Sequence, residues 1–250
     1  ASTVPVDERP MDKLAIEHFI VNRPYGCMID RGSKVTIVSP SSLVDPVVGA
    51  YSYYFAKLGG FNYISREIGE LRPYKSFYTC TDDVPGLDEY LSDIEKLSAK
   101  ESSWVITLLA ASGANEPELP SQIHLTYGGK KGDASLDAPT VVIRDKETAK
   151  AMFEELENMI ESEYDIKTDR QQYHDSANPN MFMRKLSNSD SVNGLMIRIA
   201  WSCMYWDSRR IKIAQSMADV IKKHVEPEAG IELDPELKVK GIAYEGHTLE

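Results

Sequence analysis

The chain has 250 residues, of which 42% are hydrophobic and 27% are charged, a composition typical of a soluble globular protein that buries a core of its own. The 39 acidic residues outnumber the 28 basic ones and give a net charge of −11. We therefore expect no nucleic acid and no membrane as partner, because both repel an acidic surface, and we expect another protein with a basic surface instead.

The two ends of the chain differ in character from the rest. Residues 1–10 contain two prolines and predict a flexible tail, whereas residues 249–250 resemble remnants of cloning. Between them we expect a single α+β domain over residues 11–248, with a subdomain break near 128–138, where glycine and lysine predominate. We expect a cytoplasmic location, or a periplasmic or secreted one if Ala1 begins a processed chain.

The spacing of apolar residues in the first half predicts helices that alternate with strands. Asp45 and Pro46 are typical of a helix start and Gly60 of its end, although the tyrosine-rich run 51–55 has an equally high strand propensity. The predicted helices of this half are residues 11–20, 45–60 and 87–97, and the predicted strands are residues 33–39 and 74–79.

The second half predicts more strands and two strong amphipathic helices. The predicted strands are residues 104–109, 122–127, 140–143, 195–201 and 236–244, and the predicted helices are residues 146–164 and 207–225. Residues 165–193 are polar and predict a long loop. A strand followed by a helix thus recurs three times, which predicts an α+β or α/β fold, a mixed β-sheet with amphipathic helices packed on it.

The sequence contains none of the motifs that bind nucleotide phosphates, calcium or zinc, and no Gly-x-Ser-x-Gly. Its five histidines have no other histidine or cysteine three or four residues away. We therefore expect no cofactor and no metal. Cys27, Cys80 and Cys203 are far apart in the sequence, so we also expect them to be unpaired.

Two groups of residues remain as catalytic candidates. Cys203 follows a predicted strand and could act as a nucleophile with His174 and Asp175 from the polar loop, although two neighbouring tryptophans also fit the edge of a core. Asp82 and Asp83 could serve acid–base chemistry or hold a cation. The same two carboxylates also suit the N-terminal end of the helix that follows them.

The helix predicted at 146–164 gives the first candidate binding surface, because its flanks and turns hold eight acidic residues against two basic ones. Glu154, Glu157 and Glu161 represent this face. Such a face is commonly only solvated, but it could also dock a basic partner or pair with the basic helix predicted at 207–225.

Nine aromatic residues between positions 51 and 78 give the second candidate binding surface. Tyrosines are frequent both at core edges and at interfaces, and they also stack on sugars or bases, so all three interpretations stay open. The candidate contact residues are Tyr51, Tyr53, Tyr54, Tyr63 and Tyr74.

These observations favour a non-catalytic protein-binding protein, such as an inhibitor, an immunity-type protein or a subunit of an assembly. One alternative is a small hydrolase or transferase that uses Cys203 with His174, or the pair Asp82 and Asp83. A viral or phage structural protein is the other alternative, which the sequence does not separate from the first.

Overall fold

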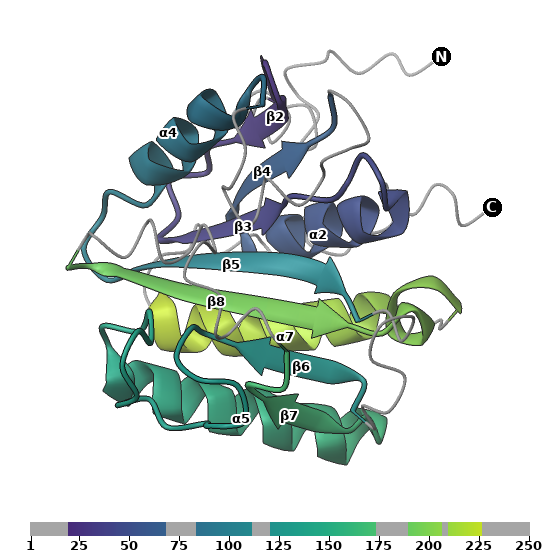
Figure 1. Ribbon diagram of the computed structural model, residues 1–250. Coiled ribbons are helices and arrows are strands. Elements are labelled where there is room, and N and C mark those ends of the chain that lie inside the picture. Colours follow the sequence, from purple (N-terminus) through teal and green to yellow (C-terminus); the bar gives the residue numbers. More distant parts are fainter. Residues whose placement is uncertain (1–19, 69–83, 112–120, 174–189, 207–209, 227–250) are drawn as a thin grey trace, which may run out of the picture.

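The computed structural model describes residues 20–68, 84–111, 121–173, 190–206 and 210–226. They form a mixed sheet of eight strands with helices packed on it, which confirms the predicted fold class (Figure 1). In order across the sheet the strands are β1 (Val21–Arg23), β2 (Gly26–Ile29), β4 (Asn62–Arg66), β3 (Val35–Ser39), β5 (Ser103–Ala110), β8 (Val192–Ile199), β6 (Ile123–Thr126) and β7 (Thr168–Arg170).

The central strands β4, β3, β5 and β8 run parallel to one another. β2 and β6 flank this group and are antiparallel to it, and β1 and β7 complete the sheet outside them. Side chains of β3, β5 and β8 are buried along almost their whole length. This explains why these strands read as nearly continuous apolar runs in the sequence.

The helices cover the two faces of the sheet unequally. α2 (Pro46–Gly59), α5 (Lys146–Tyr164) and α7 (Arg210–Val225) lie on one face, and α4 (Leu87–Leu97) lies on the other (Figure 1). A short π-helix, η3 (Ser202–Trp206), follows β8. None of the helices that the structure describes is long and apolar enough to cross a membrane.

The predicted helix boundaries follow from their capping residues. The Asp45 carboxylate accepts a hydrogen bond from the backbone N–H of Val48 at the start of α2, and Gly60, with φ 68°, ends that helix. Asp145 begins α5 in the same way, through the N–H of Thr148. The tyrosine-rich run 51–55 is therefore helical, although its strand propensity is high.

Each face of the sheet has its own apolar core. The larger core lies beneath α2, α5 and α7 and includes Phe55, Trp104 and Phe153. The smaller core lies beneath α4 and includes Ile64 and Ile94. Polar side chains are therefore unexpected on either inner face, and those that occur there need an explanation.

The strand predicted at residues 140–143 is wrong. Thr140 has φ 68°, which interrupts an extended backbone, and this segment forms only one bridge, between Gly128 and Val141. The backbone of Val142 instead bonds to the Tyr127 carbonyl and the Gly194 N–H, so the segment crosses the ends of two strands.

Other expectations differ from the structure in smaller ways. β1, β2 and β4 were not predicted, and β7 lies within the segment 165–193, which was predicted as a loop. The predicted helix 11–20 and the predicted strands 74–79 and 236–244 lie outside the described residues. The predicted subdomain break near 128–138 stays a prediction.

Candidate functional site

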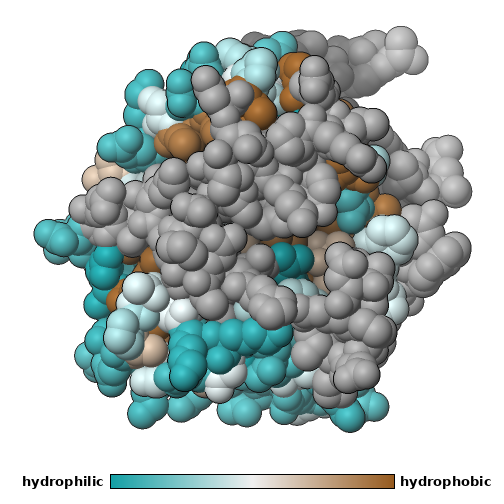
Figure 2. Space-filling view, in the orientation of Figure 1, coloured by the Kyte–Doolittle hydropathy of each residue, from teal (hydrophilic) through white to brown (hydrophobic). Residues whose placement is uncertain are grey.

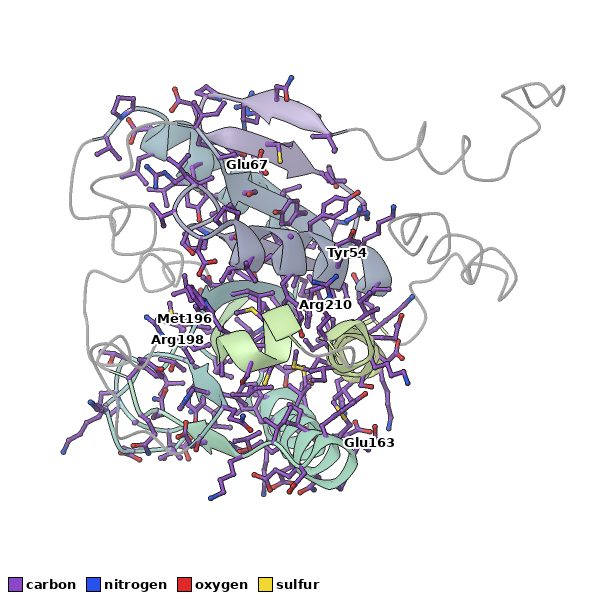
Figure 3. All side chains as sticks on the ribbon, turned by 90° about the vertical axis from the view of Figure 1, so that its right-hand side faces the viewer. Tyr54, Glu67, Glu163, Met196, Arg198 and Arg210 are labelled. Carbon is purple, nitrogen blue, oxygen red and sulfur yellow. The ribbon has the colours of Figure 1, made fainter. Side chains whose placement is uncertain are left out.

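The order of the parallel strands reverses between β3 and β5. β3 continues through α2 to β4 on one side, whereas β5, which follows α4, lies on the other side of β3. Open α/β sheets bind their ligands outside the carboxyl ends of the strands, where the strand order reverses in this way. Figure 3 looks onto this edge and shows Met196 and Arg198 on the face opposite α2 and α7.

Three polar residues follow one another across this edge on neighbouring strands. Arg198 of β8 is in register with His124 of β6, and His124 is in register with Asp169 of β7. Residues in register on adjacent strands share a face of the sheet. On the other side, Arg198 is in register with Leu109 of β5, so an apolar residue ends the polar row.

His124 and Asp169 form a close pair. The Nδ1 atom of His124 lies 2.6 Å from the Oδ1 atom of Asp169, and their side chains are only 1% and 18% exposed. Because an ionised carboxylate only accepts hydrogen bonds, Nδ1 carries the proton and Nε2 is left able to accept one. A carboxylate in this position also stabilises the imidazolium that forms when Nε2 takes up a proton.

Tyr173 joins the histidine to the arginine. Its ring makes an edge contact with the His124 ring, with centroids 4.9 Å apart, and the Arg198 guanidinium carbon lies 4.5 Å from the Tyr173 centroid. Arg198 also donates a hydrogen bond from Nη1 to the Ala110 carbonyl, at 3.2 Å. The guanidinium is thus fixed at the end of β5, beside the histidine.

Gln171 brings Tyr173 to this position. Its backbone has φ 60°, a left-handed conformation that is rare for glutamine, and its side chain is fully buried. The side chain accepts a hydrogen bond from the Tyr127 N–H at 3.0 Å and donates one to the Gly128 carbonyl. Strained residues held in this way gather at functional sites.

A second row of polar side chains lies one step further from the carboxyl edge. Thr107 of β5 and Thr126 of β6 are both in register with Met196 of β8, so they flank it on the same face. Both threonines are fully buried, and neither hydroxyl has a hydrogen-bond partner in the part of the chain that the structure describes. An unsatisfied buried hydroxyl costs about 1–3 kcal/mol, and both hydroxyls flank Met196, which is fully buried in the smaller core.

Of the catalytic candidates from the sequence, Cys203 lies among the described residues, and it does not contribute to this site. Cys203 is 3% exposed within η3 and belongs to the larger core, on the other face of the sheet. His174, Asp175, Asp82 and Asp83 lie outside the described residues, so the pairings proposed for them stay predictions. The described residues contain no cluster of three side chains that could hold a metal ion.

The tyrosines from the sequence occupy different environments. Tyr51 and Tyr63 are 5% and 2% exposed and pack into the larger core, whereas Tyr53 and Tyr54 are half-buried on α2. Burial raises the pKa of Tyr51 and Tyr63, so both stay neutral. Tyr74 lies outside the described residues.

The acidic residues of α5 are largely used within the molecule. Glu155 binds Lys223 and His224 of α7, which confirms pairing between the acidic and the basic helix at this position. Glu157 accepts a hydrogen bond from Nε of Arg170 at 2.8 Å, and Glu161 accepts one from Thr168 at 2.7 Å. Glu154 is exposed, as is Glu163, which points outward from α5 in Figure 3.

The sequence alone did not identify His124, Asp169 or Arg198 as site residues. One signal was present, because His124 and Thr126 alternate with Ile123 and Leu125, which is the pattern of a strand with one polar face. Nothing in the sequence, however, indicates that Asp169 pairs with His124 across 45 positions.

No protein-family model matches this sequence, and no curated protein matches it. Among solved structures the chain is similar to the CwlD amidase from Clostridioides difficile in complex with the GerS lipoprotein, with 13% identity, coverage of 78% of this chain and 100% of that chain, and a TM-score of 0.41. It is also similar to the gene product Atu2144 from Agrobacterium tumefaciens, with 13% identity, coverage of 90% and 97%, and a TM-score of 0.46. A uridine phosphorylase from the oomycete Phytophthora capsici has 9% identity, coverage of 77% and 90%, and a TM-score of 0.40. These scores are low, so none of the three assigns an activity to this chain.

Proposed function

We propose that the protein is an enzyme of the hydrolase class in which His124, oriented by Asp169, acts as general base and acid on a small substrate at the carboxyl edge of the sheet. The observation that carries this proposal is the 2.6 Å contact between His124 and Asp169 in one row with Arg198. The proposal shares the hydrolase class with the alternative of a small hydrolase or transferase, but it uses His124 and Asp169 instead of Cys203 with His174 or the pair Asp82 and Asp83.

The proposed chemistry uses one water molecule. Nε2 of His124 takes a proton from the water, and the water oxygen attacks the carbonyl or phosphoryl centre of the substrate. Asp169 stabilises the imidazolium, and Arg198 stabilises the negative charge that develops on the substrate oxygen. The bond between the substrate centre and the leaving group then breaks, and the imidazolium gives its proton to the leaving group. The new bond to the water oxygen thus replaces the bond to the leaving group.

The test compares two histidine–carboxylate pairs of the same chain. His124→Gln removes the base of the proposed site, whereas His224→Gln removes the histidine that binds Glu155 between α5 and α7. Nitrophenyl esters, nitroanilides and nitrophenyl phosphates serve as substrates. We expect wild-type turnover of one of these three classes, a loss of roughly 100-fold or more in His124→Gln, and near wild-type rates in His224→Gln. Equal rates in wild type and His124→Gln would refute the proposal.

Binding of a basic partner protein is the second candidate function. It is favoured by one observation, the exposed acidic side of α5, along which Glu147, Glu154 and Glu161 recur every seven residues. In Figure 2, hydrophilic side chains dominate the lower part of the molecule, where β7 lies in Figure 1. This function needs no catalysis and is tested separately below.

A further inference from the structure

We propose that Arg31 and Tyr53 form an anion-binding site that takes the phosphate group of a small molecule. Arg31 lies in the connection between β2 and β3, and Tyr53 lies on α2. This connection leads into the amino end of β3, whereas His124 is in register with Arg198, one residue before the end of β8. The site is therefore at the other edge of the parallel strands, and the inference goes beyond the proposed function.

The position of Arg31 is fixed by Phe61 and Asn62, where β4 begins. The buried Asn62 side chain accepts a hydrogen bond from the Arg31 N–H at 2.9 Å. The Arg31 guanidinium donates a hydrogen bond from Nη1 to the Phe61 carbonyl at 2.7 Å. The Nε and Nη2 atoms remain, and they form the edge of a guanidinium that can bind two oxygens of one anion.

Two other arginines show how this edge is used when a carboxylate is near. Arg23 donates from Nε and Nη2 to the two oxygens of Asp93. Arg170 donates from the same two atoms to Glu157. Arg31 is half-buried like both of them, but none of the salt bridges among the described residues includes it, and its Nε and Nη2 bond to no described residue. Its free edge therefore suits an anion from outside the chain.

The surroundings of Arg31 favour a negative ligand. Burial lowers the pKa of Arg31, and among the described residues only Tyr53 opposes this shift, so no carboxylate neutralises the guanidinium. The Lys57 ammonium lies 5.9 Å from the centre of the Tyr53 ring, and it adds positive charge beside Arg31. The negative end of the α2 dipole is near, but the Gly60 and Phe61 N–H groups bond its last carbonyls.

Tyr53 favours a phosphate over a carboxylate. Its ring contacts the edges of Tyr54 and Tyr63, with centroids 5.7 Å apart in each pair, and its hydroxyl bonds to no described residue. A carboxylate has two oxygens, which the free edge of Arg31 takes, whereas a phosphate ester has a third terminal oxygen for the hydroxyl. Both side chains are half-buried, so the ligand binds at the surface and needs no cavity.

Binding is measured calorimetrically with inorganic phosphate, phenyl phosphate and benzoate, at a pH at which phosphate is a dianion. We expect phenyl phosphate to bind with a dissociation constant of about 1 mM or lower, and benzoate to bind at least about tenfold more weakly, because it lacks the third oxygen and the second charge. Tighter binding of phenyl phosphate than of inorganic phosphate identifies an ester as the ligand, and the reverse order identifies the free ion.

Two results with these probes would overturn the inference. Benzoate that binds as tightly as phenyl phosphate would remove the preference for phosphate. The failure of both phosphates to bind at roughly 10 mM would remove the site itself.

Variants locate the bound phosphate. Arg31→Gln should weaken the binding of phenyl phosphate about tenfold or more, and Tyr53→Phe, which keeps the ring, should weaken it by roughly three- to tenfold. Lys150→Gln is the matched control, because it also removes one positive charge, from an exposed position on α5, and it should bind as tightly as wild type. Unchanged affinity in Arg31→Gln would refute the site, as would equal weakening in Arg31→Gln and Lys150→Gln.

Two further comparisons complete the test. Arg31→Gln also loses the bond to the Phe61 carbonyl, so if urea denaturation shows that it does not fold, Tyr53→Phe decides, and unchanged affinity there refutes the site. His124→Gln should bind phenyl phosphate as tightly as wild type, because His124 lies at the other edge of the strands. If His124→Gln loses this binding, phenyl phosphate occupies the site of the proposed function, and the inference fails while the proposed function stands.

Discussion

Gln171 keeps a left-handed backbone because four hydrogen bonds hold it there. Its N–H donates to the Leu125 carbonyl and its carbonyl accepts from the Gly132 N–H, while its side chain bonds to Tyr127 and Gly128. These bonds fix the chain that leaves β7. The ring of Tyr173, two residues further on, therefore has a defined position against His124 and Arg198.

Gln171→Ala is expected to lower the free energy of unfolding by about 2–4 kcal/mol, measured by urea denaturation. The substitution keeps the backbone strain and leaves two buried backbone groups, the Tyr127 N–H and the Gly128 carbonyl, without their partner. Gln172→Ala is the control, since among the described residues its side chain bonds to the Arg170 carbonyl, at 3.2 Å, and the substitution should cost less than about 1 kcal/mol. Equal losses in the two variants would contradict this account.

At the scale of single residues, the sequence predicted only features with a local signature. Asp45 and Gly60 are readable as caps because they act on groups within the same turn of helix. The positive φ of Gln171 has no such signature. It depends on contacts with Tyr127 and Gly128, directly after β6 and more than 40 positions earlier in the chain, which only the folded protein provides.

Among the elements, α5 contacts β7, which carries Asp169 of the proposed site. Glu155 fastens it to α7, whereas Glu157 and Glu161 fasten β7 to it through Arg170 and Thr168. Thr168 and Arg170 are the direct neighbours of Asp169 in the sequence, so their contacts with α5 help to place the carboxylate of the proposed site. Much of the acidity that suggested a docking surface is thus used inside the molecule.

The pair between Glu155 and α7 predicts a dependence of stability on pH. The hydrogen bond from Lys223 lowers the pKa of Glu155 below its ordinary 4.5, against the opposing effect of partial burial, and the bond from His224 adds to the shift. A carboxylate with a lowered pKa stabilises the fold above its unfolded pKa and loses that contribution as the pH falls through the lowered value.

Glu155→Gln is therefore expected to be less stable than wild type at pH 7, by no more than about 1 kcal/mol, because the pair is partly exposed. The difference from wild type should shrink as the pH is lowered below 4.5. Urea denaturation at several pH values measures it, with Glu154→Gln, an exposed neighbour, as control. A difference that stays constant from neutral to acid pH would argue against the pair.

At the scale of elements, length decided what the sequence could predict. α5 was predicted with its correct bounds because its buried side chains recur at helical spacing over 19 residues. β1 and β7 have three residues each, too few for a period, and they are strands because their partners β2 and β6 complete their hydrogen bonds. Tertiary pairing, which the sequence does not display, therefore decided these elements.

For the molecule as a whole, the proposed site and the acidic surface are separate features. The residues of the site come from β5, β6, β7 and β8, which lie far apart in the sequence. They share the face of the sheet opposite α5. The sequence predicted the mixed sheet, but it could not predict which polar strand residues become neighbours. The sequence did predict that acidic residues lie together along α5, because both the helical spacing and the charges are visible in the sequence.

The last prediction separates a local docking surface from the general attraction of a chain with net charge −11. Glu147→Lys combined with Glu154→Lys reverses two exposed charges on α5, and Glu89→Lys combined with Glu95→Lys reverses two on α4, on the opposite face of the sheet. Both variants change the net charge equally. If α5 docks a basic partner, only the first should slow association with a lysine-rich peptide of roughly twenty residues, by about tenfold at low salt, and the effect should fade as salt is added. Stopped-flow fluorescence at two salt concentrations measures both rates. If both variants slow association equally, the attraction belongs to the charge of the whole molecule, and α5 has no special role in it.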